Sequence, residues 1–99
     1  MGELDRVSER FEAITKEMVD LCRRKNKDYG CSVSETYKQY GMVSFLVRMQ
    51  DKINRVRSLI VNKKQEVSDE KIRDSLIDLA NYSILAVIEL EKEESSNER

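Results

Sequence analysis

The chain has 99 residues, enough for one small domain with one hydrophobic core. Its 18 Lys and Arg are offset by 19 Asp and Glu, and the net charge of −1 gives no overall field toward DNA or a membrane, so any basic site must be local. With no His and 2 Cys, a Ser-His-Asp triad, a Cys-His pair and an ordinary zinc centre are excluded.

The composition predicts an all-α protein. There is no Pro to interrupt a helix, and Glu, Lys, Arg and Leu are abundant. The first residues are charged and no long apolar stretch follows, so we expect neither a signal peptide nor a membrane span, and a cytoplasmic location.

The first helix is predicted over residues 3–25. Apolar residues recur at spacings of three and four and form a narrow stripe, as in bundles and coiled coils: Leu4, Val7, Phe11, Ile14, Met18 and Leu21. Cys22 falls on this stripe and is expected to be a reduced, buried thiol rather than half of a disulfide.

The stretch "RRKNKDYG", residues 23–30, is predicted to end this helix, with Gly30 making the turn. Three interpretations remain open: a cationic helix end, the rim of an anion site, or a contact with a protein partner. The anion rim would use Lys25, Lys27, Asp28 and Tyr29, with Ser32 close behind.

A short helix is predicted over residues 34–40. Ser32 and Glu35 have the spacing of a capping box, and Gly41 is expected to end the helix. This helix carries Tyr37 and Tyr40, which either pack beneath it or stack on a nucleobase.

The second long helix is predicted over residues 42–62. Its stripe repeats the spacing of the first, and Phe45 and Leu59 widen it: Met42, Leu46, Met49, Ile53, Val56 and Ile60.

The third long helix is predicted over residues 69–92, with Ser68 or Asp69 as its cap. In "LIDLANYSILAVIEL" apolar residues occupy most of the circumference, so this helix needs cover on more than one side. We therefore expect one antiparallel bundle domain over residues 1–93, completed by a homo-oligomer (dimer or higher) with this helix at its centre, and a flexible charged tail over 94–99.

Polar residues interrupt the apolar pattern of both later helices. One flank of the second helix carries Arg48, Asp51, Lys52 and Arg55, and the third helix carries Asp74, Asp78, Asn81 and Tyr82. Asp78 lies within the apolar segment, where an ionised carboxylate needs a cation as partner. The flanks either form ion pairs that set the register of two helices, or line a pocket in which carboxylates hold Mg²⁺ and cations hold phosphate.

Several segments together resemble a known family. "KNKDYG" with Ser32, then Gly41, "VRMQDKINRVRSLI" and "VSDEKIRDSLIDLANYSI" resemble nucleotide modification associated domain 1, a small helical domain of phages and prophages, over residues 22–90. The resemblance implies a phage-type helical protein tied to nucleotide metabolism, acting in the host cytoplasm.

A more distant similarity is to the MazG-like all-α nucleoside triphosphate pyrophosphohydrolases. Those enzymes bind Mg²⁺ through E-x-x-E on one helix and E-x-x-D on the next. The best alignment places Asp51-x-x-Asn54 and Asp78-x-x-Asn81 there, so each pair keeps one carboxylate and has an amide in place of the second. Asp51 and Asp78 would be metal ligands only if the protein is an enzyme.

The first functional hypothesis is therefore a binding protein that sequesters a nucleotide or a nucleotide-derived immune signal without turnover. Its predicted ligand-binding residues are Lys25, Lys27, Asp28, Tyr29, Ser32, Arg48, Asp51, Lys52, Arg55, Asp78, Asn81 and Tyr82. The first alternative is Mg²⁺-dependent pyrophosphohydrolysis through Asp51, Asp74 and Asp78 with Glu12 or Glu17. The second is an adaptor that binds a host protein through the third helix. We expect no nucleic acid and no membrane partner.

Overall fold

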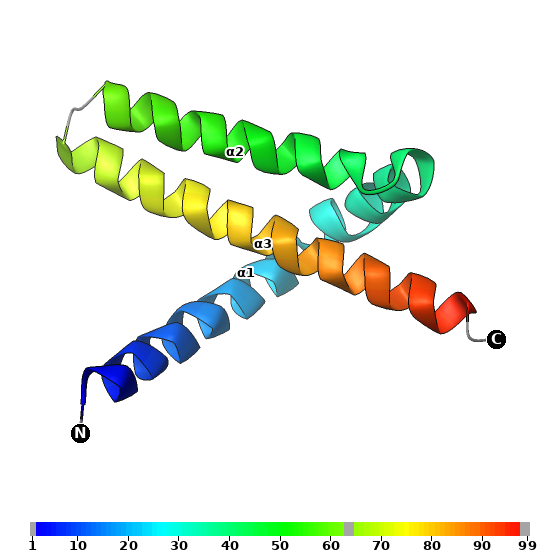
Figure 1. Ribbon diagram of the computed structural model, residues 1–99, viewed down its shortest axis with the longest axis horizontal. Helices are drawn as coiled ribbons and strands as arrows, with labels where there is room; N and C mark the ends of the chain where they lie inside the picture. Colours follow the sequence, from blue (N-terminus) through cyan, green and yellow to red (C-terminus); the bar gives the residue numbers. More distant parts are fainter. Residues whose placement is uncertain (1, 63–64, 98–99) are drawn as a thin grey trace. The chain divides into compact units, whose positions relative to one another are not determined.

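The structure, a computed structural model, describes residues 2–62 and 65–97, and the side chains in those ranges except 26–31, 65–68 and 96–97. Within these ranges the chain is helical and has no strand, which confirms the all-α prediction. The helices are α1 (Glu3–Tyr40), α2 (Val43–Val61) and α3 (Gln65–Asn97), labelled in Figure 1. The chain divides into two compact units, Met1–Val33 and Ser34–Arg99, and each is described by itself.

The predicted turn within residues 23–30 is wrong, because α1 continues through Gly30 to Tyr40. Gly30 alone is too weak a helix breaker: in a helix interior it costs only about 1 kcal/mol relative to Ala, and no Pro accompanies it. The Ser32–Glu35 pair consequently lies inside a helix rather than at a helix start. Glu35 forms an exposed ion pair with Lys38, at 3.8 Å.

Gly41 ends α1 as predicted. Its φ of +70° lies in the left-handed region, which glycine adopts without steric cost. The Gly41 N–H donates to the Tyr37 carbonyl at 2.7 Å, the single bond of an αL helix end. The Ser44 hydroxyl then donates to the Gly41 carbonyl at 2.8 Å at the start of α2.

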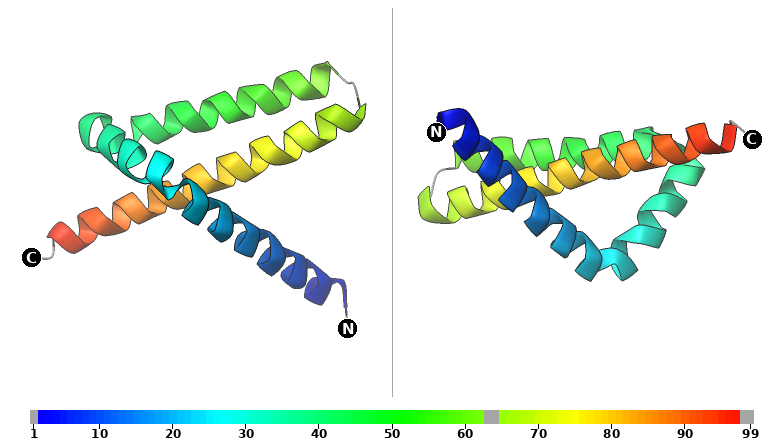
Figure 2. Two further views of the ribbon diagram at one scale, coloured as in Figure 1. Left: turned by 180° about the vertical axis from the view of Figure 1, so that it is seen from behind. Right: turned by 90° about the horizontal axis from the view of Figure 1, so that it is seen from below.

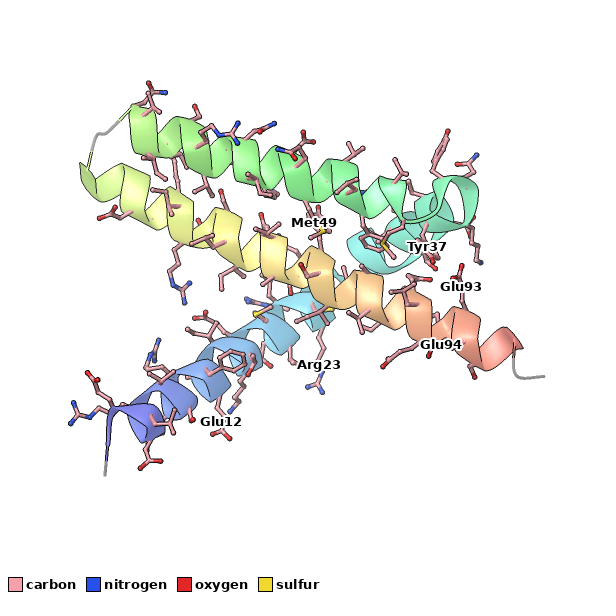
Figure 3. The ribbon with its side chains drawn as sticks, in the orientation of Figure 1. Glu12, Arg23, Tyr37, Met49, Glu93 and Glu94 are labelled. Atoms are coloured by element: carbon pink, nitrogen blue, oxygen red, sulfur yellow. The ribbon has the colours of Figure 1, made fainter. Side chains whose placement is uncertain are left out.

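In the unit of residues 34–99, α2 and α3 pack side by side as an antiparallel helical hairpin (Figures 1 and 2). Phe45 of α2 is 1% exposed, and its ring lies 5.7 Å from that of Tyr37, tilted by 50°. Met49, one turn after Phe45, points from α2 toward α3 (Figure 3). Of the two roles predicted for the tyrosines, Tyr37 therefore has the packing role, whereas Tyr40 is exposed.

The side of α2 that faces α3 differs from the predicted stripe. Phe45 is buried and Met49, Lys52, Val56 and Leu59 are half-buried, so they form the inner face. Four of the six residues of the stripe predicted for residues 42–62 are exposed, including Leu46, Ile53 and Ile60. The helix α2 is rotated so that Phe45 faces α3, because this large ring gains the most free energy from burial.

The third helix is longer at both ends than predicted. It begins at Gln65, so Ser68 and Asp69 lie inside it and neither caps it, and it continues past Lys92 to Asn97. Its middle, residues 77–83, is half-buried on every side, whereas Ile84, Val87 and Ile88 are exposed. Ser75, Ala86 and Glu89 are buried.

In the unit of residues 1–33, the N-terminal part of the apolar stripe is exposed at Leu4, Val7 and Phe11. Cys22 is a free thiol, but it is exposed, so the prediction that it is buried is wrong. Its position falls one residue beyond Leu21, at the edge of the stripe rather than on it. Among the described residues, no helix is both long and apolar enough to cross a bilayer.

Candidate functional site

A cationic groove lies along the contact between α2 and α3. Its walls are four residues from α2 and one from α3, and its volume is about 350 Å³: Arg48, Asp51, Lys52, Arg55 and Tyr82. The four α2 residues follow one another at steps of three, one and three, which keeps them on one side of the helix. Three side chains carry positive charge and one carries negative charge, although the protein as a whole is nearly neutral.

Lys52 joins the groove to α3 through an ion pair. Its Nζ lies 2.9 Å from Oδ2 of Asp78, and both side chains are 27% exposed. Asp78 therefore has a cationic partner on α2, as the ion-pair interpretation of the polar flanks predicted. Water still reaches both groups, so the pair lies at the edge of the helix contact and not in a dry interior.

Arg48 of α2 contacts the aromatic ring of Tyr82 on α3. Its guanidinium carbon lies 5.8 Å from the centre of the Tyr82 ring, within the range of a cation–π contact. Both side chains are half-buried, whereas Asp51 and Arg55 are exposed. The groove thus has two ordered cations at the helix contact and one accessible cation at its rim.

The other predicted site residues are not brought to this groove. Asn81 is half-buried on α3 but lies outside the groove lining, and Asp74 is exposed. Lys25 and Ser32 are exposed residues of the first unit. The side chains of Lys27, Asp28 and Tyr29 lie outside the described residues, so their predicted role stays a prediction.

The carboxylates do not assemble into a metal cage among the side chains that the structure describes. No group of three or more Asp, Glu or Cys residues there could hold a metal ion. An oxygen of Asp78 is engaged by Lys52, and the side-chain oxygen of Asn54 accepts a hydrogen bond from Gln50 at 3.0 Å. The described residues therefore do not fit the multi-Mg²⁺ site implied by the MazG-like alignment.

A second polar cluster, formed by Tyr37, Glu89, Lys92 and Glu93, was not predicted from the sequence. The buried Tyr37 hydroxyl donates a hydrogen bond to Glu93, labelled with it in Figure 3. Burial, then the hydrogen bond to Glu93, then the negative charges of Glu93 and Glu89 raise the pKa of Tyr37. Glu89 is itself buried and pairs with Lys92 at 3.2 Å. The available signal was the spacing of four between Glu89 and Glu93, which places both on one helix face.

The fold and groove define a small all-helical protein with a local cationic pocket between two antiparallel helices. The chain belongs to the family described as nucleotide modification associated domain 1, which matches residues 25–90. The match includes all of α2, every residue of the groove and most of α3. Neither a curated protein nor a solved structure matched the chain.

Proposed function

We propose that the groove between α2 and α3 binds the phosphate of a nucleotide or nucleotide-derived signalling molecule, and that the protein sequesters this ligand without turnover. The observation that carries the proposal is the convergence of Arg48, Lys52 and Arg55 with Tyr82 on one pocket. A volume of about 350 Å³ lies within the range of small-molecule sites.

Each side chain in the groove suits one part of such a ligand. Guanidinium groups make charge-assisted hydrogen bonds to phosphate, and Arg55 is the accessible one. Tyr82 offers a ring face to a base, since stacking on an aromatic side chain contributes about 1–3 kcal/mol. Asp51 can accept hydrogen bonds from ribose hydroxyls.

Sequestration rather than hydrolysis is favoured by the charge balance of the groove. Asp51 is the one carboxylate of its lining. Asp78 and Lys52 neutralise each other, so Arg48 and Arg55 remain against Asp51. Cations in this excess attract phosphate, whereas pyrophosphate hydrolysis needs several carboxylates to fix the metal.

The broader parts of the proposal rest on the family. We place the protein among phage proteins that act against host defence in the cytoplasm, by removing a nucleotide signal. Its helices would then form a MazG-like bundle completed by oligomerisation, with the exposed Ile84, Val87 and Ile88 of α3 in contact with another copy.

Calorimetric titration tests the function. The purified protein is titrated with cyclic nucleotides, ADP-ribose derivatives and nucleoside triphosphates. The masses of the ligands recovered afterwards are measured by mass spectrometry. Binding of one class with an unchanged ligand mass is expected. Arg55→Ala should weaken it at least tenfold, and Arg57→Ala, an exposed α2 cation outside the groove, should not. Absence of heat with every class would remove the proposal, and release of pyrophosphate in Mg²⁺ would replace it with the enzyme alternative.

A further inference from the structure

The first half of α1 presents an apolar seam that is open to solvent. Leu4, Val7 and Phe11 are exposed, Phe11 at 68%, and a shallow groove of about 400 Å³ runs beside them. Glu3, Arg6 and Arg10 also line this groove. A row of large apolar side chains at heptad spacing is the inner surface of a two-helix coiled coil.

The charges beside the seam follow a regular alternation. With Leu4 as the first core position of a heptad, the residue before each such core position is Glu3, Arg10, Glu17 and Arg24 in turn. Side chains at these positions flank a coiled-coil seam and set which helix pairs with it and in which direction. The opposite flank carries the small polar residues Ser8 and Thr15.

We propose that this face of α1 binds a second copy of itself, antiparallel, over residues 3–24. In this register the central layers place Phe11 against the partner's Ile14, and the end layers place Leu4 against the partner's Leu21. All four flanking pairs then join opposite charges: Glu3 with the partner's Arg24, Arg10 with the partner's Glu17, and the two symmetric equivalents.

Other arrangements lose this match. Sliding the antiparallel pair by one heptad opposes Arg10 to Arg10 or Glu17 to Glu17, and each like-charge pair destabilises the contact. A parallel pair would place Glu3 and Arg10 opposite Ser8 and Thr15, which carry no charge. The sequence therefore specifies one direction and one register.

One seam residue must adjust. Met18 is 6% exposed, and in this register it receives the partner's Val7. Methionine is unbranched and has three rotatable bonds, so the end of its side chain can change direction when the partner helix packs beside it. Ile14 and Leu21, the other two residues of this half, are half-buried and still partly accessible.

Charge exchange in the full chain tests the pairing by sedimentation velocity. The wild type should self-associate, Arg10→Glu and Glu17→Arg should each weaken association about tenfold, and the double exchange should restore it to within about threefold. Phe11→Ser should weaken association at least a hundredfold, with helicity retained in circular dichroism. A monomeric wild type, or a double exchange as weak as the single ones, would overturn the proposal.

Cross-linking tests the direction separately from the strength. In a background with Cys22→Ser and Cys31→Ser, chains with Ser8→Cys are mixed with chains with Thr15→Cys and treated with a short bis-maleimide. Antiparallel pairing predicts mainly mixed cross-links, because Ser8 faces the partner's Thr15. Mainly like-with-like cross-links, as a parallel pair gives, or no cross-links, as contact through another surface gives, would contradict it. Ligand binding by α2 and α3 plays no part in either readout.

Discussion

The ammonium of Lys52 lies 2.9 Å from Oδ2 of Asp78 and joins α2 to α3, with both side chains 27% exposed. This ion pair belongs to both interpretations of the polar flanks, the structural one and the functional one. The pair aligns two helices, and Lys52 also lines the cationic groove. Because both side chains keep some contact with water, part of the desolvation cost of a buried ion pair is avoided.

The ion pair should contribute measurably to stability. Asp78→Asn removes the carboxylate that lies 2.9 Å from the half-buried Lys52 ammonium, so we expect a loss of about 1–2 kcal/mol in the free energy of unfolding. Lys52→Met retains apolar packing and should cost less. Urea denaturation of the two single variants and the double variant should give a coupling energy of about 0.5–1 kcal/mol. Additive effects would mean that the contact contributes nothing.

The same two variants should change phosphate binding in opposite directions. Asp78→Asn removes a negative charge next to the groove and should tighten nucleotide binding a few-fold, although the fold is weakened. Lys52→Met removes a groove cation and should weaken binding about tenfold. Calorimetry below the unfolding transition separates the two effects. Equal losses in both variants would indicate that the pair acts only through the fold, and loss of a Mg²⁺-dependent activity in Asp78→Asn alone would favour the enzyme.

Helix content and family were predictable from the sequence, but the ends of the helices were predictable only in part. Apolar spacing and the lack of Pro predicted the helices, and Gly41 was identified as the end of α1 because αL geometry favours glycine. Gly30 carried the same local signal, yet α1 continues through it. A single glycine costs a helix so little that neighbouring residues decide the outcome.

The site was predictable in part for a similar reason. Helical spacing placed Arg48, Asp51, Lys52 and Arg55 on one flank, and apolar surroundings required a cation for Asp78. Which cation would reach it depends on how α2 is rotated against α3, and the burial of Phe45 determines that rotation. Spacing along one helix carries no information about the contact of Tyr37 with Glu93, because it joins α1 to the far end of α3.

Gly41 should be required for its backbone geometry alone. A Cβ added there meets no atom within 4 Å, so any cost comes from φ of +70°. Gly41→Ala should lower the free energy of unfolding by about 1–2 kcal/mol, and Gly41→Asn by less, since Asn tolerates the left-handed region. Gly2, which also has open space around it, provides the control, and Gly2→Ala should change stability little. Equal effects of Ala and Asn at position 41 would contradict this explanation.

Tyr37 should make the free energy of unfolding depend on alkaline pH. Burial and the neighbouring Glu93 raise the pKa of Tyr37 above its ordinary value of 10.0, so in the folded state the phenol keeps its proton at a pH where the unfolded chain loses it. The unfolded state then binds fewer protons, and stability falls as pH rises from about 10 toward the raised pKa. Below that window the group adds no pH dependence.

Urea titrations at pH 8 and at several values above 10 measure this effect. Tyr37→Phe should be less stable than the wild type at pH 8, because it loses the hydrogen bond to Glu93. The free energy of unfolding of Tyr37→Phe should fall less steeply with pH than that of the wild type. The two curves therefore converge above about pH 10, where Tyr37 destabilises the folded wild type. Tyr40→Phe, at an exposed position on the same helix, should follow the wild-type curve. Parallel curves for wild type and Tyr37→Phe would show that Tyr37 ionises equally easily in the folded and unfolded states, which would contradict the burial of Tyr37 and its hydrogen bond to Glu93.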